Sequence, residues 1–240
     1  MEEAVAGIEE NIRKDAGVFV TLTGVHGIME SQYDEQVKRI HSEAAMCLPD
    51  GMPTVWVGRV YGHGNMRRIC GPDLMLEIMK ISVAKGYTHF FYGGKQGVPE
   101  LLKERLVSRF PGLKIVGTLS PPFRPLTEQE EIEFKELIES LRPDIIWVGL
   151  STPKQEKWMF EHSGKLNARV MIGVGAAFDF HAGLLKRAPH WMQQLGLEWF
   201  FRLCVEPGRL WRRYLYNNPR FVWLILRQII REKEFIHIVE

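Results

Sequence analysis

The stretch TEQEEIEFKELIESLRPDIIWVGLSTPKQE, residues 127–156, predicts a helix, a buried strand and the start of another helix in succession. Thr127 and Glu130 form a capping box ahead of apolar residues at helical spacing, so a helix is predicted over Glu128–Leu141. Asp144–Gly149 is apolar on both faces, which is typical of a strand covered by helices on either side. A second helix is predicted over Lys154–Glu161.

The same alternation of short apolar runs and segments of helical period extends in both directions from this stretch. It predicts four more strands, at Val18–Thr23, His89–Tyr92, Lys114–Thr118 and Arg169–Val174. It also predicts three more helices, at Asp34–Met46, Asp73–Ala84 and Pro99–Phe110. Alternation of this kind predicts an α/β fold, with a Rossmann-like, mostly parallel sheet and helices on both faces.

The character of the sequence changes at about Pro189. Four of the seven tryptophans are interleaved with arginines beyond this point, in segments of helical period. We therefore predict an α/β domain over residues 1–188 and a C-terminal helical appendage over residues 189–240. Between Trp199 and Arg231 the only acid is Glu206, against seven arginines, so the appendage is expected to bind anionic partners.

Composition limits the classes of protein that fit. A chain of 240 residues that is 45% hydrophobic can bury a core, and its formal net charge of +2 is modest. The three cysteines lie far apart and form no C-x-x-C pair, so neither a disulfide framework nor a zinc site is predicted. The N-terminus has no signal-peptide pattern, and the apolar run Phe221–Leu226 is too short to span a bilayer. A cytoplasmic setting is expected.

One carboxylate stands out in a stiff loop. Asp50 lies between Pro49 and Pro53 and is followed by Gly51, so the backbone around it bends at a single point. An aspartate in such a turn can cap the helix that follows it. It can also serve as a general base, which requires a fixed carboxylate within hydrogen-bond reach of a hydroxyl group.

Further candidates follow the predicted strands, where ligands of open α/β sheets bind. His26, Gly93 and Gly175 lie at strand ends, and Gln155 lies in the first turn of a helix. An ordinary loop histidine, tight turns and a solvated glutamine are the alternatives. The sequence has no D-x-D pair to hold a metal on a diphosphate, so arginines are expected to neutralise the diphosphate charge. Arg68 is one candidate for this role. The alternative for Arg68 is a surface salt bridge.

Taken in order, several motifs resemble those of the WecG/TagA/CpsF family of glycosyltransferases. They are PDGMPTVW at residues 49–56, GPDLM at 71–75, STPKQEKW at 151–158 and the long block GVGAAFDFHAGLLKRAPHWMQQLGLEWFFRLCVEPGRLWRRYL at 173–215. The resemblance covers most of the chain, and the long block is highly specific.

The resemblance implies an inverting transfer without a metal or other cofactor. The donor would be a UDP-sugar, commonly UDP-N-acetylmannosamine or its uronic acid, or a UDP-glucose type. The acceptor would be a saccharide on a polyprenyl diphosphate, used in cell-surface polysaccharide synthesis. Asp50 is then the expected general base, Arg68 and Gln155 line the donor pocket together with the glycines Gly93 and Gly175, and Asp179 contacts the nucleoside.

One segment departs from the family pattern. Many members carry a Thr-x-Asn signature after the first strand, where this chain reads Thr21, Leu22, Thr23, Gly24, Val25 and His26. We expect Thr23 and His26 to occupy that corner of the catalytic site. If Thr23→Ala and His26→Ala both leave the transfer rate unchanged, this assignment is wrong.

A lipid-borne acceptor would give the appendage a physical role. Tryptophans suit the headgroup region of a membrane, and each arginine near an anionic surface contributes about 1 kcal/mol. The appendage is expected to hold the protein on the inner face of the cell membrane and to grip the acceptor diphosphate. The arginines assigned to these roles are Arg202, Arg209, Arg212, Arg213 and Arg220. A second copy of the chain is an alternative partner for the same surface.

Other classes of protein share parts of this pattern. Arginines interleaved with aromatics also suit single-stranded nucleic acid, although nucleic-acid binding leaves the strand-end motifs unexplained, so no nucleic-acid partner is expected. A dinucleotide-dependent oxidoreductase would share the alternation, but its fingerprint glycines are absent after the first strand. A non-catalytic scaffold is the third alternative.

Overall fold

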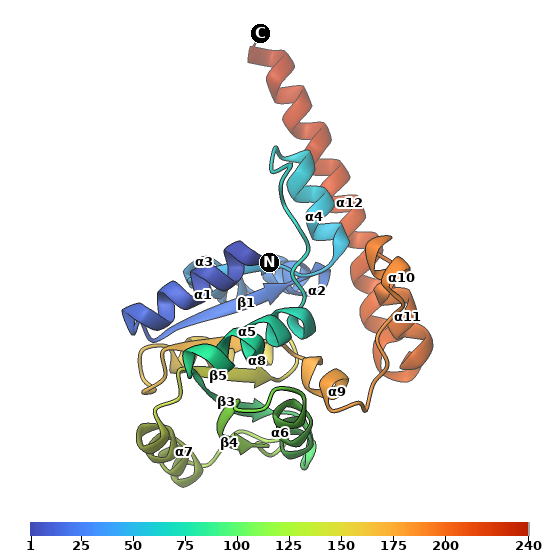
Figure 1. Ribbon diagram of the computed structural model, residues 1–240. Helices are drawn as coiled ribbons and strands as arrows, with labels where there is room; N and C mark the ends of the chain where they lie inside the picture. Colours follow the sequence, from blue (N-terminus) through green and yellow to red (C-terminus); the bar gives the residue numbers. More distant parts are fainter. Residues whose placement is uncertain (240) are drawn as a thin grey trace.

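The computed structural model describes residues 1–239, with side chains as far as Arg231, and its centre is a six-stranded parallel sheet (Figure 1). The strands lie in the order β2-β1-β6-β5-β3-β4, and every pairing is parallel. Their bounds are β1 Val18–Thr23, β2 Met46–Pro49, β3 Thr88–Gly93, β4 Lys114–Leu119, β5 Ile145–Gly149 and β6 Val170–Gly173. The α/β fold and its parallel sheet are therefore as predicted.

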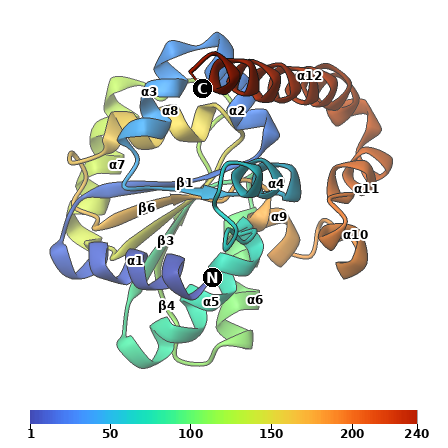
Figure 2. The ribbon, with the colours of Figure 1, turned by 90° about the horizontal axis from the view of Figure 1, so that it is seen from above.

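Helices cover both faces of the sheet, so the strands are buried on both sides. Side chains alternate along β5, where Trp147 packs into one core and Ile146 into the other. The first core is formed with α1 (Glu2–Lys14), α5 (Gly71–Lys85) and α6 (Val98–Arg109). The second is formed with α3 (Glu35–Glu43), α7 (Glu128–Leu141) and α8 (Lys154–His162). Figure 2 shows these two helical layers on opposite sides of the strands.

The predicted helix over Glu128–Leu141 is confirmed as α7, including its capping box. The prediction of a helix over Asp34–Met46 is wrong at its C-terminal end, because α3 stops at Glu43 and β2 begins at Met46. This edge strand is only four residues long and ends in proline, so it carries little strand signal. It exists because Val20 to Thr23 of β1 pair with it.

Three helices that lie before β3 were not predicted. In α1 the buried residues Ala4, Ile8 and Ile12 recur every four positions and pack on the first core, although charged residues separate them. The other two, α2 (Val25–Tyr33) and α4 (Met52–Val60), begin directly after β1 and just beyond β2. Both are therefore placed at the carboxyl edge of the sheet, beside the loops in which candidate residues were expected.

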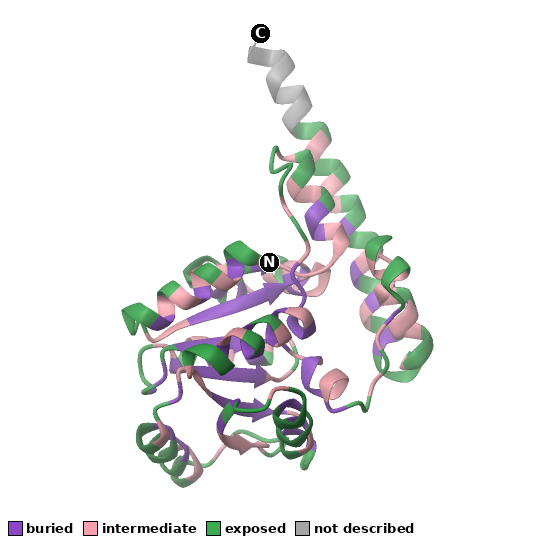
Figure 3. Ribbon diagram, in the orientation of Figure 1, coloured by how far each residue is buried: buried purple, intermediate pink, exposed green. Residues whose placement is uncertain are grey.

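The C-terminal part of the chain is helical, as predicted. Its elements beyond residue 189 are α10 (His190–Gln194), α11 (Glu198–Val205) and α12 (Pro207–Val239). The short helix α9 (Ala177–His181), which lies before this boundary, was not predicted. Helix α12 contacts α2 and then projects beyond the sheet and its helical layers (Figure 1). Figure 3 shows exposed residues recurring along it, in contrast to the buried strands. Within the described residues, no helix combines the length and apolar character needed to cross a membrane. The domain boundary near residue 189 stays a prediction.

Candidate active site

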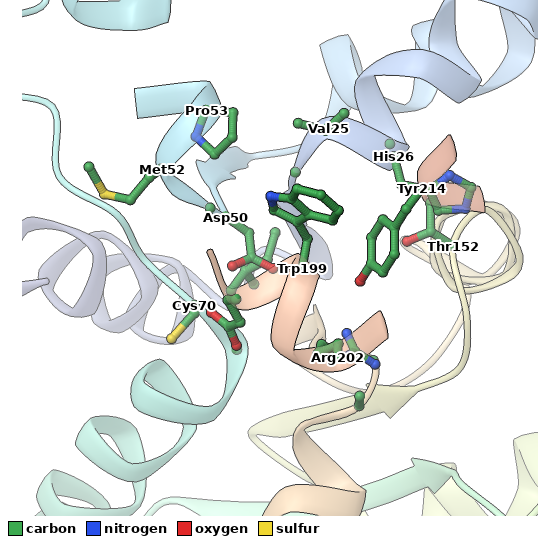
Figure 4. A pocket seen from close by; sticks show the side chains of 18 of the residues that line it. Val25, His26, Asp50, Met52, Pro53, Cys70, Thr152, Trp199, Arg202 and Tyr214 are labelled. Atoms are coloured by element: carbon green, nitrogen blue, oxygen red, sulfur yellow. The ribbon is translucent and has the colours of Figure 1, made fainter. Parts of the chain in front are cut away.

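A cavity of about 660 Å³ lies at the carboxyl ends of β1, β2, β5 and β6. In the strand order β6 and β1 are neighbours although they are far apart in the chain, and crevices at such crossovers bind ligands in open α/β sheets. The opposite side of the cavity is formed by α4, α11 and α12. Residues from both sides of position 189 thus form one site, and Figure 4 shows the side chains at its centre.

Asp50 lies at the base of this cavity, directly after β2. Its backbone N–H donates to the Thr23 carbonyl oxygen at 3.0 Å, which continues the pairing of β2 with β1. Gly51 follows with φ of 100°, a conformation that favours glycine, and α4 starts at the next residue. The Asp50 side chain does not cap α4, and no described group donates a hydrogen bond to its carboxylate. Figure 4 shows this carboxylate beside Trp199, directed into the cavity.

The surroundings of Asp50 make it a stronger base than an ordinary aspartate. Burial, with the nearby Glu198 carboxylate as a second cause, raises the pKa of Asp50 to about 6. Arg68, Arg202 and Arg213 act in the opposite direction and stabilise its ionised form. A carboxylate with a pKa near neutrality is suited to accept a proton from a substrate hydroxyl group.

Arg68 is fixed at the side of the cavity by residues that follow α9. Its guanidinium lies 3.2 Å from the Glu198 carboxylate and donates to the Gln193 side-chain oxygen at 3.1 Å. The same Gln193 oxygen accepts from Arg187, which is paired with Asp73. The surface salt bridge considered for Arg68 is thus a half-enclosed ion pair inside the site. Through it, the start of α11 is held against the loop before α5.

Three arginines of α11 and α12 line the cavity, namely Arg202, Arg209 and Arg213. Arg202 and Arg209 both reach Glu206, at 3.6 Å and 2.7 Å. Among the described groups, the buried Nε atoms of Arg202 and Arg213 have no hydrogen-bond partner. Burial also lowers the pKa of Arg213. Unsatisfied, desolvated guanidinium groups are costly unless an anion completes them, so this side of the cavity is built to receive one.

The other two arginines assigned to the acceptor lie elsewhere. Arg212 is exposed and stacks over the Trp211 ring, and Arg220 donates to the Tyr33 hydroxyl at 3.0 Å. Neither belongs to the cavity lining formed by the described residues. Both point away from the site because successive residues of a helix lie about 100° apart, which sequence proximity to Arg213 does not reveal. Their contact with a membrane stays a prediction.

His26 lines the cavity and connects α2 to α12. Its Nδ1 accepts from the Asn217 side-chain amide at 3.0 Å, and the ring bonds to the Thr152 backbone. Burial, with the Arg213 charge as a second cause, lowers its pKa from 6.5 to about 4, so the ring is neutral at pH 7. Because its hydrogen bonds join three segments, His26 is placed to hold α12 over the site.

We expect His26→Gln to make the protein less sensitive to mild acid. A histidine with a lowered folded pKa contributes stability that is complete above the unfolded pKa of 6.5 and is lost as the pH falls toward about 4. Between pH 7 and pH 5 the wild type should therefore lose up to about 2 kcal/mol more unfolding free energy than the variant. Urea unfolding at the two pH values measures this, and equal losses would show that His26 is not buried as described.

Gln155, Gly175 and Asp179 also line the cavity. Gln155 is buried rather than solvated. Its Oε1 accepts from the Gly175 N–H at 3.1 Å, and its Nε2 donates to Glu156 at 3.0 Å. It therefore fixes the loop after β6 against the loop after β5. Asp179 is half-buried on α9, and burial raises its pKa.

Besides Arg212 and Arg220, two more predicted site residues are not among the described residues that line the cavity, Gly93 and Thr23. At Gly93 a side chain would collide with the backbone of Gly149, so this glycine is required by the close approach of β3 and β5. Thr23 is buried, and its hydroxyl contacts His41 Nδ1 at 3.2 Å and Cys47 Sγ at 3.3 Å, behind the cavity wall. Direct roles for Gly93 in donor binding and Thr23 in catalysis stay predictions.

Sequence reasoning missed Glu198, Trp199, Tyr214 and Asn217, all of which line the cavity. Asn217 is buried and bonds His26, and the ring of Trp199 packs edge-on against Tyr214. Figure 4 shows Trp199 and Tyr214 over the centre of the site. Glu198 gave no local signal, because its partner Arg68 lies far away in the sequence.

Comparison with known proteins identifies the family of the chain. The model of the glycosyl transferase WecG/TagA/CpsF family matches residues 1–235. The chain is 32% identical over 194 residues to N-acetylglucosaminyldiphosphoundecaprenol N-acetyl-beta-D-mannosaminyltransferase of Bacillus subtilis (strain 168), covering 81% of this chain and 73% of that protein. It is 29% identical over 214 residues to the enzyme of the same name from Bacillus spizizenii, covering 89% and 80%. With that of Staphylococcus aureus (strain MRSA252) it shares 29% over 186 residues, covering 78% and 70%.

Proposed function

Since the chain belongs to the WecG/TagA/CpsF family and is a glycosyltransferase, we propose that it moves a sugar from a UDP-sugar onto a polyprenyl-diphosphate-linked saccharide. The names of its relatives support this kind of acceptor, because each describes transfer onto N-acetylglucosaminyldiphosphoundecaprenol. They also support N-acetylmannosamine as the transferred sugar, with its uronic acid or a glucose-type sugar as alternatives. The product would enter bacterial cell-surface polysaccharide synthesis.

One observation carries the proposal. A carboxylate with no hydrogen-bond donor among the described groups lies close to the charges of Arg68, Arg202 and Arg213. Arg209 lines the same cavity. The reaction needs both features, because a hydroxyl proton must be removed and two diphosphates, one on the leaving UDP and one on the lipid carrier, must be bound. The arginines are Arg68, Arg202, Arg209 and Arg213.

The proposed transfer is a single displacement. The acceptor hydroxyl oxygen attacks the anomeric carbon of the donor as Asp50 takes the hydroxyl proton. The bond from the anomeric carbon to the diphosphate oxygen breaks, and UDP leaves with the electron pair. Because attack and departure occur on opposite sides of the anomeric carbon, its configuration inverts. Ionised Asp50 is required, so the step needs a pH above the raised pKa of this residue.

On the donor side, we assign the UDP-sugar to the part of the cavity between Arg68 and the loops after β5 and β6. Gln155 holds the Gly175 loop, and we assign Asp179, which lines the same cavity, to the nucleoside. Guanidinium groups can neutralise the leaving diphosphate, so the proposed reaction uses no divalent metal. Transfer in excess EDTA should equal transfer in added Mg²⁺, whereas loss of activity on chelation would contradict this part.

On the acceptor side, Arg202, Arg209 and Arg213 are assigned to the diphosphate of the lipid carrier. Helix α12 also exposes Trp211, Trp223 and Arg227, side chains that suit an anionic membrane surface. We therefore place the protein on the inner face of the cell membrane as a peripheral protein. Charge reversal at Arg212 and Arg220 should weaken liposome binding, and unchanged binding would remove this assignment.

Release of UDP tests the proposed function as a whole. The wild type would be mixed with a panel of UDP-sugars, each with and without a prenyl-diphosphate-linked N-acetylglucosamine. We expect one donor to give UDP at a rate that depends on the acceptor. If none is consumed and none raises the melting temperature, the proposal is wrong, and the basic surface should be tested with single-stranded RNA against anionic liposomes.

The Glu198 carboxylate sets how basic Asp50 is, which gives a pH prediction. Activity should rise with pH through a midpoint near 6 in the wild type, because Asp50 must lose its proton. Glu198→Gln removes a nearby negative charge and frees Arg68, and both changes lower the pKa of Asp50. The midpoint of kcat/KM should therefore move to lower pH. Glu206→Gln, which removes an acid paired with Arg209 instead, should shift it less.

A further inference from the structure

The cavity continues past the polar site into an apolar groove between α4 and α12. The α4 wall is formed by Trp56 and Val57, and the α12 wall by Phe221, Val222, Ile225 and Leu226. Leu195, in the turn between α10 and α11, lies on a third side. None of these seven side chains carries a charge. We refer to them as the apolar groove.

The groove has a direction. Along α12, the lining changes from Arg213 and Asn217 at the polar site to Ile225 and Leu226 farther out, a distance of roughly 20 Å along the helix axis. Along α4 it changes in the same sense, from residues beside Asp50 to Trp56 and Val57. Both helices project from the carboxyl edge of the sheet (Figure 1). The groove therefore starts at the arginines and leads away from the sheet.

Several groove side chains are exposed despite being apolar. Trp56 is 46% exposed, Val222 54% and Leu226 55%. Apolar side chains that face a common groove and remain in water are unfavourable, which indicates an apolar occupant. The turn before α11 packs closely against one wall of the groove at Gly196. A side chain at this position would collide with the Trp56 ring.

We propose that the apolar groove binds the first isoprene units of the acceptor's polyprenyl chain, while the arginines hold its diphosphate and Asp50 meets its sugar hydroxyl. This inference rests on the proposed function. Along the cavity, Asp50, the arginines and the apolar groove follow one another. A sugar, two phosphates and a hydrocarbon chain follow one another in the same order along such an acceptor. A nucleotide sugar has no apolar end that would occupy this groove.

The inference predicts that the enzyme distinguishes acceptors by their hydrocarbon chains, independently of a membrane. Two acceptors with the same diphosphate and sugar would be compared in detergent, one with a long prenyl chain and one with a short alkyl chain. The wild type should favour the prenyl acceptor in kcat/KM by about tenfold or more, because several buried CH₂ groups contribute to its binding.

Ile225→Asp should abolish this preference, and Val57→Asp on the facing wall should do the same. Ile230→Asp is the matched control, because Ile230 lies on the same helix, is 56% exposed and is outside the described cavity lining. It should keep the preference of the wild type. An unchanged shift in melting temperature on adding the UDP-sugar would show that each variant folds and binds the donor.

The outcomes distinguish failure of the groove assignment from failure of the proposed function. Suppose that the wild type transfers sugar to the acceptors, and that Ile225→Asp and Ile230→Asp have the same effect on the preference. The groove then does not bind the prenyl chain, although the proposed function stands. If the wild type transfers to neither acceptor, the proposed function fails and the groove assignment fails with it. Loss of the preference in Ile225→Asp and Val57→Asp alone supports the groove.

Discussion

Asp50→Asn is expected to lower the rate of sugar transfer by about 10²–10⁴-fold, the usual contribution of a general base. The amide keeps the size and shape of the side chain but cannot accept the hydroxyl proton. Binding of the UDP-sugar should persist, because the donor is assigned to Arg68 and to the loops after β5 and β6. The rate is measured as acceptor-dependent UDP release at pH 8, where Asp50 is ionised.

The same substitution should not destabilise the protein, and this separates loss of chemistry from loss of fold. A carboxylate whose folded pKa is raised from 3.8 to about 6 destabilises the native state once it ionises. At pH 8 Asp50→Asn should therefore raise the free energy of unfolding by up to about 3 kcal/mol.

Asp34→Asn is the matched control for the first prediction. Asp34 caps α3 and pairs with Lys157 at 2.7 Å, outside the cavity lining formed by the described residues. This variant should keep the wild-type rate while losing a little stability. A rate for Asp50→Asn within a few-fold of the wild type would contradict the role of Asp50.

Arg213→Met should lower kcat/KM by about 10–10²-fold, because a charge-assisted hydrogen bond to the acceptor's diphosphate contributes about 1.5–3 kcal/mol to binding. The reason is its position, because its guanidinium is buried at the cavity and its Nε has no partner among the described groups. Methionine retains much of the apolar stem and removes the charge. Burial lowers the pKa of Arg213, so its removal should not reduce stability.

Arg212→Met is the matched control, since it removes the same charge from the neighbouring position. Arg212 is exposed and stacks on Trp211, away from the cavity lining. With a short-chain acceptor in detergent it should keep most of the wild-type activity. Equal losses in the two variants would mean that α12 supplies only general positive charge, and the assignment of Arg213 to a diphosphate would be wrong.

The sheet could be predicted because its strands are apolar on both faces and bounded by turns. Asp144–Gly149 gave a clear signal of this kind and is found as β5, Ile145–Gly149. By contrast, β2 is stabilised by its partner rather than by its own sequence, because Met46 to Pro49 pair with β1. A short edge strand of this kind has no internal pattern long enough to detect.

The site was predictable where a residue's own loop fixes it. Asp50, between two prolines, is the clearest example. Glu198 was missed because its role comes from Arg68, 130 positions earlier in the chain, and no local pattern encodes that distance. Thr23, by contrast, was predicted to be in the site but does not line the cavity formed by the described residues. A strand end indicates the edge of the sheet, but whether a side chain faces the cavity depends on pleat and packing.

The most direct test of the account is the product formed from a UDP-sugar and a prenyl-diphosphate-linked N-acetylglucosamine. We predict an acceptor whose mass has increased by one sugar residue, with an anomeric configuration opposite to that of the donor. Free sugar and UDP without a lipid product, or a product of retained configuration, would contradict the single displacement assigned to Asp50 and the arginines of α11 and α12.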